Sequence, residues 1–214
     1  LLWQISALLR ARWRLENLLI MLPMISNLAE LDSGLALVRR AFKELTEEEG
    51  YVLKMPALGA MIEVPAAVYQ VKEIGRRVDF MSVGTNDLTQ YLLAVDRNNP
   101  RVAELYDSLH PSILRALKSI YDQAATVNCQ LSVCGEMAGD PLSAVILLGL
   151  GYENLSMSAS SLLRVKSLLL KVSREMADDL ATQSLGLSDG AEVVAHISEI
   201  LEPFKYAKNK PLSN

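Results

Sequence analysis

The sequence predicts an α/β protein with a parallel sheet, in the form of part of a (β/α)8 barrel. One observation is the regular alternation of short apolar runs with amphipathic helical segments. Another is that the runs are continuously apolar, as in parallel strands that are covered on both faces. A third is that most runs end in polar residues. The runs expected as strands are Leu18–Met24, Leu58–Glu63, Val78–Gly84, Gln130–Gly135 and Asn154–Ser158.

Helical patterns lie between the expected strands. In the segment Leu28–Glu47, apolar residues recur at every third or fourth position. Pro65, Pro111 and Pro141 are favoured helix openers, and Gly151 is a typical helix stop. The expected helices are Leu28–Glu47, Ala66–Arg77, Pro111–Val127, Leu142–Leu150, Ser160–Ser173 and Asp189–Phe204.

The ends of the expected strands favour a barrel over an open sheet. An open parallel sheet places its ligand at one switch point, whereas a barrel builds its site from many strand ends. Here every strand after the first ends in polar chemistry: Glu63, Asn86-Asp87, Cys134-Gly135-Glu136 and Ser156-Met157-Ser158. A complete barrel has eight strands, so the strands expected here correspond to its C-terminal five-eighths. We expect one barrel domain over residues 1–204 and a polar tail over residues 205–214.

Composition excludes several classes of protein. The chain has 214 residues, is 50% hydrophobic and carries a net charge of −4, so no broad basic surface is available for nucleic acid. No apolar stretch approaches the roughly 18 residues that cross a bilayer. The segment Leu1–Leu22 is interrupted by charges and is typical of a helix leading into a strand, not of a signal peptide. Cys129 and Cys134 should point to opposite faces of the sheet, which disfavours a disulfide. A cytoplasmic location is therefore expected.

Two carboxylates are the first candidate functional residues. Glu63 and Asp87 each follow a short apolar run, one strand-helix-strand step apart. Carboxylates at neighbouring strand ends suit a hard divalent cation that holds a phosphorylated ligand. Asp87 taken alone is equally typical of a helix N-cap. Glu63, inside an apolar run and one position before Val64-Pro65, fits that alternative poorly.

Longer motifs resemble a known family. They are Met21-Leu22-Pro23-Met24, the block of residues 78–97 with Gly84-Thr85-Asn86-Asp87-Leu88-Thr89-Gln90 at its centre, Cys134-Gly135-Glu136-Met137-Ala138-Gly139-Asp140, and Leu155-Ser156-Met157-Ser158. In this order they resemble the C-terminal domain of phosphoenolpyruvate-utilising enzymes. Within that family they are most similar to enzyme I of the sugar phosphotransferase system, in its nitrogen-related branch. The resemblance implies an eight-stranded α/β barrel, of which this chain represents roughly strands four to eight.

The resemblance also implies roles for individual residues. Glu63 and Asp87 match the Mg²⁺ ligands of the family. Asn86 matches a substrate-binding amide, and the backbone around Thr85 matches an anion site at a helix start. Arg97 matches a phosphate-binding arginine, although its position beside Asp96 is otherwise typical of a surface charge.

Cys134 matches the thiol that protonates the enolate of phosphoenolpyruvate to give pyruvate, and this role requires a protonated thiol. Without the resemblance, its apolar strand end would indicate an inert buried cysteine. Cys129 lies in no motif and is expected to serve packing. His110 and His196 lie in no phospho-acceptor motif, so we expect both to be structural.

The resemblance implies a Mg²⁺-dependent phosphotransferase that moves phosphoryl from phosphoenolpyruvate to a protein histidine and then to a phosphocarrier protein. The acceptor histidine and further phosphate-binding arginines would lie in a preceding N-terminal region, so this chain alone should not transfer phosphoryl. Two alternatives remain open: the C-terminal domain of a pyruvate phosphate dikinase or phosphoenolpyruvate synthase, and a non-catalytic dimerisation module. An open strand edge predicts that the isolated chain forms a homodimer or is poorly soluble.

Overall fold

A four-stranded parallel sheet forms the centre of the computed structural model, which describes residues 1–12, 15, 17–48 and 50–205. The strand order follows the chain, β1-β2-β3-β4. The bounds of the strands are Leu19–Leu22 for β1, Ala57–Ile62 for β2, Phe80–Gly84 for β3 and Gln130–Cys134 for β4. All three pairings are parallel. The predicted α/β class with a parallel sheet is therefore confirmed.

The expected fifth strand, Asn154–Ser158, is not a strand in the structure. It is reduced to one parallel bridge between Val133 and Leu155. The Val133 N–H donates to the Asn154 carbonyl at 2.9 Å, and the Ser156 N–H donates to the Val133 carbonyl at 2.8 Å. Pairing goes no further because the flanking residues are exposed and Ser158 already caps the next helix.

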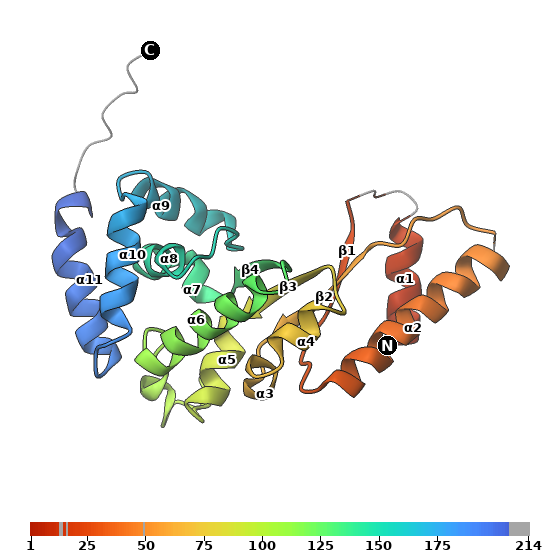
Figure 1. Ribbon diagram of the computed structural model, residues 1–214, viewed down its shortest axis with the longest axis horizontal. Helices are drawn as coiled ribbons and strands as arrows, with labels where there is room; N and C mark the ends of the chain where they lie inside the picture. The colour runs from red at the N-terminus through yellow and green to blue at the C-terminus, as the bar shows by residue number, and fades with distance from the viewer. Residues whose placement is uncertain (13–14, 16, 49, 206–214) are drawn as a thin grey trace, which may run out of the picture.

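Helices occupy the connections between the strands and the C-terminal third of the chain. Figure 1 shows α1 and α2 beside β1 at one end of the molecule and α8 to α11 at the other, with the sheet between them. The bounds are α1 Leu2–Arg12, α2 Leu28–Lys43, the π-helical turn η1 Glu44–Glu48, α3 Pro65–Val68, α4 Val71–Gly75, α5 Thr85–Leu92, the 3₁₀ turn η2 Ala103–Leu105, α6 Pro111–Ala125, α7 Glu136–Gly139, α8 Pro141–Gly149, α9 Ala159–Leu169, α10 Arg174–Ser184 and α11 Gly190–Lys205.

Two helical predictions were wrong in detail. The expected helix over Ala66–Arg77 is divided into α3 and α4, with Tyr69 and Gln70 between them. The expected helix over Ser160–Ser173 ends at Leu169, because a separate helix, α10, begins after Ser173. The Ser173 hydroxyl accepts the Met176 N–H at 3.1 Å and caps α10. The buried stripe of α10 consists of Ala177, Leu180, Ala181 and Ser184, so it contains only one large apolar residue.

The core lies between the sheet and the helices that pack against it and against one another. The buried side chains of the strands, such as Ile20, Ile62 and Met81, belong to the same cluster as those of α2, α4 and α6. The pair α8 and α10 extends this core toward the C-terminus. The carboxyl ends of the strands remain free to carry polar groups.

Several smaller expectations can be compared with the structure. His110 is the N-cap of α6, where its Nδ1 accepts the Ser112 N–H at 3.2 Å, and His196 lies within α11 as predicted. Cys129 and Cys134 are both free thiols. The expected tail, residues 205–214, lies outside the described residues except for its first residue, which ends α11. Among the residues that the structure describes, no helix has the length and apolar character to span a membrane.

Candidate active site

The predicted site residues gather at the carboxyl ends of three neighbouring strands. Glu63 directly follows β2, and Cys134 is the last residue of β4. Thr85, Asn86 and Asp87 form the first turn of α5, which begins directly after β3. Because β2, β3 and β4 are parallel neighbours, these ends share one edge of the sheet.

Glu63 is a buried carboxylate in a fixed orientation. Only 3% of the residue is exposed. Its Oε1 accepts the backbone N–H of Met24 at 2.7 Å. Its Oε2 lies over Gly84, where an added Cβ would come within 2.6 Å of the oxygen. Glycine at position 84 therefore makes room for the carboxylate.

The electrostatics of Glu63 favour a cation beside it. Burial raises the pKa of Glu63 above its ordinary value, the Met24 N–H opposes this shift, and the nearby Asp87 carboxylate adds to it. Two carboxylates side by side, one of them buried, repel each other in their charged forms. A cation between them would remove both penalties.

Arg97 reaches this pair from the loop that follows α5. Its Nη2 lies 3.8 Å from Asp87 Oδ1, and both side chains are about one third exposed, at 33% and 35%. The Arg97 backbone N–H donates to Gln90 Oε1 at 3.3 Å. The guanidinium thus stands beside the acid pair at the surface, where its planar array of donors suits phosphate oxygens.

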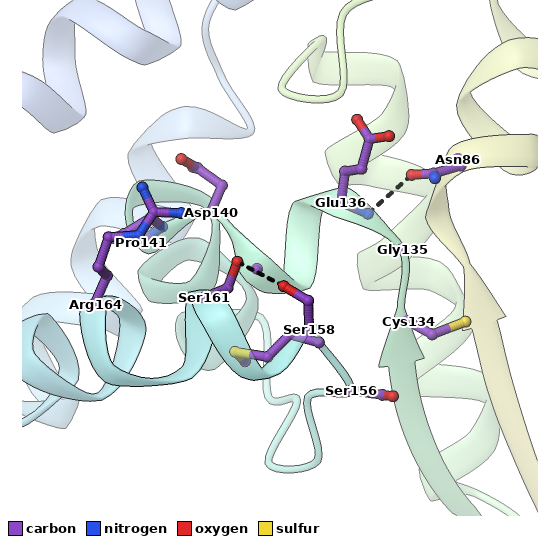
Figure 2. Close-up of a pocket in the computed structure, with 12 residues that line it drawn as sticks. Asn86, Cys134, Gly135, Glu136, Asp140, Pro141, Ser156, Ser158, Ser161 and Arg164 are labelled. Atoms are coloured by element: carbon purple, nitrogen blue, oxygen red, sulfur yellow. Dashed lines mark hydrogen bonds between the residues drawn. The ribbon is translucent and has the colours of Figure 1, made fainter.

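The amide of Asn86 is oriented by the end of the next strand. Its Oδ1 accepts the Glu136 backbone N–H at 3.0 Å, as Figure 2 shows. Because the carbonyl oxygen is occupied, the Nδ2 donors of Asn86 are the groups left for a ligand. Asn86 also lines the cavity described below.

Thr85 has a different role from its neighbours. Its side chain is fully buried, and its Oγ1 donates to the Cys134 carbonyl at 2.8 Å. This hydrogen bond joins the start of α5 to the end of β4. Any contact of Thr85 with a ligand would have to come from its backbone.

Cys134 points its sulfur toward β3. The Sγ–H donates to the Val83 carbonyl at 3.4 Å, an arrangement that suits a protonated thiol. The residue lines a cavity of about 600 Å³ together with Asn86, Gly135 and Glu136. Ser156, Ser158, Ser161 and Arg164 also line this cavity, with Ser156 beside the end of β4 (Figure 2). The thiol thus borders a polar cavity at the same edge as the acids.

Sequence reasoning missed two residues at the site. Met24 contributes only its backbone N–H to Glu63, so its side-chain type carries no signal. Tyr106 lies in a long loop, with its hydroxyl 3.5 Å from the Asn86 carbonyl. Burial raises the pKa of Tyr106, a shift opposed by Thr89 and Arg97 and increased by the nearby carboxylates. The segment that begins at Tyr106 contributes to the resemblance to the nitrogen-related branch, but that resemblance gave Tyr106 no role at the site.

The donor set fits Mg²⁺. In the described part of the chain, no three histidine, cysteine or acidic side chains come together as a metal cluster. Mg²⁺ is usually held by one or two carboxylates while waters and substrate phosphates complete its shell. Glu63 and Asp87 supply such a pair of oxygen donors, with Arg97 placed for the phosphate.

Comparison with known proteins shows the family of the chain. The sequence profile of the family described as "PEP-utilising enzyme, PEP-binding domain" matches residues 1–174. This chain belongs to that family. The match extends from α1 through α9 and includes each of the residues discussed above.

Curated relatives of this PEP-utilising family member are longer proteins. One from Salmonella typhimurium, named "Phosphoenolpyruvate-dependent phosphotransferase system", is 48% identical over 93% of this chain and 27% of the relative. One from Cupriavidus necator, named "Phosphoenolpyruvate-protein phosphotransferase", is 40% identical over 94% of this chain and 34% of the relative. The chain therefore spans about a quarter to a third of these relatives.

Solved structures also show the fold. An HpcH/HpaI aldolase/citrate lyase family protein from Burkholderia cenocepacia superposes with a TM-score of 0.52 at 20% identity, over 80% of this chain and 69% of that one. A citrate lyase from Burkholderia xenovorans has a TM-score of 0.51 at 14% identity, over 90% of this chain and 65% of that one. At such identities the likeness concerns the fold alone.

Proposed function

We propose that this chain supplies the phosphoenolpyruvate-binding half of a Mg²⁺-dependent phosphoenolpyruvate-protein phosphotransferase. The observation that carries the proposal is the meeting of Glu63, Asp87 and Arg97 at the sheet edge where the β4 thiol also lies. The names of the curated relatives support a phosphotransferase over a dikinase or a synthase.

Each group in the site matches a part of the substrate. Phosphoenolpyruvate carries a phosphate and a carboxylate on an enol. Arg97 would bind phosphate oxygens, and the Nδ2 donors of Asn86 would bind an oxygen of the enol or carboxylate. Glu63 and Asp87 would hold Mg²⁺, which supplies charge neutralisation for phosphoryl transfer. The buried position of Glu63 fixes where that charge lies.

The thiol of Cys134 completes the reaction. When the bond between phosphorus and the enol oxygen breaks, phosphoryl passes to an imidazole nitrogen of the acceptor histidine and an enolate is left. The Sγ–H of Cys134 then gives its proton to C3 of the enolate, so that pyruvate and a thiolate are formed. Water reprotonates the thiolate before the next turnover. The Val83 carbonyl, which accepts the Sγ–H at 3.4 Å, orients the thiol at the end of β4.

The remaining expectations belong to the whole protein and stay predictions. They are a barrel in which this chain forms strands four to eight, a single domain over residues 1–204, and an acceptor histidine and phosphocarrier contact in an N-terminal region. Homodimer formation, a cytoplasmic location and membership of the nitrogen-related branch are predicted with them. The likeness to the two solved structures is compatible with the barrel.

Calorimetry tests the proposal. Phosphoenolpyruvate is titrated, with MgCl₂ or with EDTA, into this chain and into a chimera in which the chain replaces the matching segment of the Cupriavidus necator relative. We expect Mg²⁺-dependent binding, because the acid pair needs a cation. Glu63→Gln or Asp87→Asn should weaken it at least about tenfold.

Asp122→Asn is the matched control, because Asp122 is an exposed acid on α6 that pairs with Lys118. It should leave the affinity unchanged. Binding that is equally strong in EDTA would remove the metal from the proposal. If neither protein binds phosphoenolpyruvate, the proposed function is wrong.

A further inference from the structure

Arg97 lies in a long loop, two residues after the buried Val95, whose N–H donates to the Gln90 carbonyl at 2.9 Å. Residues 93–110 connect α5 to α6, and the only helical turn within them is η2. The contacts of Arg97 with α5 are both long: 3.3 Å from its N–H to Gln90 Oε1 and 3.8 Å from Nη2 to Asp87 Oδ1. A phosphate-binding guanidinium needs a more exact position, because misplacement of a binding group by 1 Å is costly.

Tyr106 connects the far end of this loop to the start of α5. Its hydroxyl donates to the Asn86 carbonyl at 3.5 Å. Thr89, one turn further along α5, is fully buried, and its Oγ1 makes no hydrogen bond within the described part of the chain. The Tyr106 phenol lies beside this hydroxyl and close to Arg97. The phenol is thus the polar group that fills the space between the loop and α5.

The surroundings of Tyr106 favour a neutral phenol. Burial raises the pKa of Tyr106, Thr89 and Arg97 oppose this shift, and the carboxylates of Glu136 and Asp87 add to it. Tyr106 also shares a small cavity of about 300 Å³ with Glu136 and Asp140, two residues that line the larger cavity beside Cys134. Tyr106 therefore stands where the loop, α5 and the end of β4 meet.

We propose that Tyr106 is a positioning residue for the phosphate-binding group: its hydroxyl fixes the loop of residues 93–110 against α5 and thereby holds Arg97 beside Asp87. The inference rests on the proposed function, since it assigns to Arg97 the phosphate of phosphoenolpyruvate. Tyr106 acts through Arg97 and needs no contact with the substrate itself.

A double-mutant cycle tests the coupling. Tyr106→Phe should weaken Mg²⁺-dependent phosphoenolpyruvate binding roughly threefold to tenfold, the effect of one net hydrogen bond. In an Arg97→Ala background the same substitution should change the affinity little, because the group that Tyr106 positions is gone. A purely structural role would reduce binding equally in both backgrounds.

Tyr152→Phe is the matched control. Tyr152 also donates its hydroxyl to a carbonyl, that of Leu117 at 2.8 Å, but it is buried away from the site. Tyr152→Phe should lower the free energy of unfolding and leave the affinity unchanged. If wild-type protein binds phosphoenolpyruvate and Tyr106→Phe binds it equally well, the positioning role is wrong.

A second measurement needs no substrate. Modification of Arg97 by phenylglyoxal, followed by mass spectrometry, should become several times faster in Tyr106→Phe as the loop is released. If the wild type binds no phosphoenolpyruvate, the proposed function fails. In that case a faster modification still supports the positioning of Arg97 by Tyr106, and an unchanged rate refutes it.

Discussion

The two cysteines stand at opposite ends of β4, and their surroundings differ. At the carboxyl end, Cys134 donates to a neighbouring strand and borders a polar cavity beside Asn86 and Glu136. At the other end, Cys129 directly precedes β4, makes weak contacts with the Val78 and Gln130 carbonyls at 3.9 Å and 3.8 Å, and borders a separate cavity of about 370 Å³ that none of the predicted site residues lines. Residue type alone therefore does not make a site. Function requires that the ends of several strands bring complementary groups to the same place.

The largest difference between Cys134 and Cys129 should appear in the rate of proton transfer to and from pyruvate. Cys134→Ser should slow exchange of the pyruvate methyl protons, measured by ¹H NMR in deuterium oxide with Mg²⁺, by at least about 100-fold, because a hydroxyl is a much weaker acid than a thiol. This partial reaction needs no acceptor histidine. It is measured on whichever protein binds phosphoenolpyruvate, the chain or the chimera.

Cys129→Ser is the control and should exchange at the wild-type rate. If Cys134→Ser keeps full exchange, Cys134 has no part in the proton transfer. If both variants lose it, the contrast between the two ends of β4 is wrong.

Two glycines with positive φ, one at the site and one away from it, allow the site to be compared with the rest of the molecule by substitution. Gly135, at the site, has φ +100°, and Gly151, which follows α8, has φ +110°. An alanine at either position should lower the free energy of unfolding by about 1–3 kcal/mol, measured by urea denaturation. A Cβ at Gly135 would collide with Thr85 Oγ1 and come within 2.9 Å of Asn86 Oδ1. Gly135→Ala should therefore also weaken phosphoenolpyruvate binding.

Gly151→Ala should not weaken binding, because its Cβ would meet the ring of Tyr121 instead. Equal losses of affinity in the two variants would show that binding follows general stability. In that case the orientation of Asn86 would not matter.

The smallest expected effect is the pH dependence of stability. Burial raises the pKa of Glu63 from its ordinary value of 4.5, and burial raises that of Cys129 from 9.0. In both cases the folded state binds the proton more tightly than the unfolded state. In EDTA, the Tm should thus fall as the pH rises from about 4.5 through the folded pKa of Glu63, and fall again above about 9.

Substitutions show which residue, and so which end of the sheet, causes the fall in Tm in each pH range. Glu63→Gln should flatten the acidic fall, and Cys129→Ser should reduce the alkaline one. MgCl₂ should oppose the fall in the acidic window, since Glu63 and Asp87 form a pair of oxygen donors at the carboxyl end. If Mg²⁺ does not change the Tm at pH 7, the placement of a cation beside Glu63 is wrong.

The sequence predicts the sheet well because β1 to β4 are continuous apolar runs, and each lies within one of the expected ranges or starts one residue before it. The prediction of a strand over Asn154–Ser158 is wrong, because polar and exposed neighbours of Leu155 prevent further pairing. The helix α10 was not predicted either; its buried stripe has helical spacing but only one large apolar residue, Leu180.

For the site, the positions of the functional side chains were predictable from the sequence, but the groups that orient them were not. Glu63, Asp87 and Cys134 were expected together because the carboxyl ends of parallel strands share an edge. Their roles came from the resemblance to a family, and Arg97 alone is indistinguishable from a surface charge. The contribution of Met24 is a backbone N–H, and that of Tyr106 depends on a loop path that no local pattern determines.

The hydrogen bond from Thr85 to the Cys134 carbonyl can form only after β4 has been synthesised, and this order has a consequence for biosynthesis. Glu63, Asp87 and Arg97 are near neighbours in sequence, so the ribosome releases them together and they can meet early. The thiol emerges only after the whole of α6, and its pairing with β3 is a long-range contact that forms slowly. A nascent chain halted before β4 would carry the acids and the guanidinium without the proton donor.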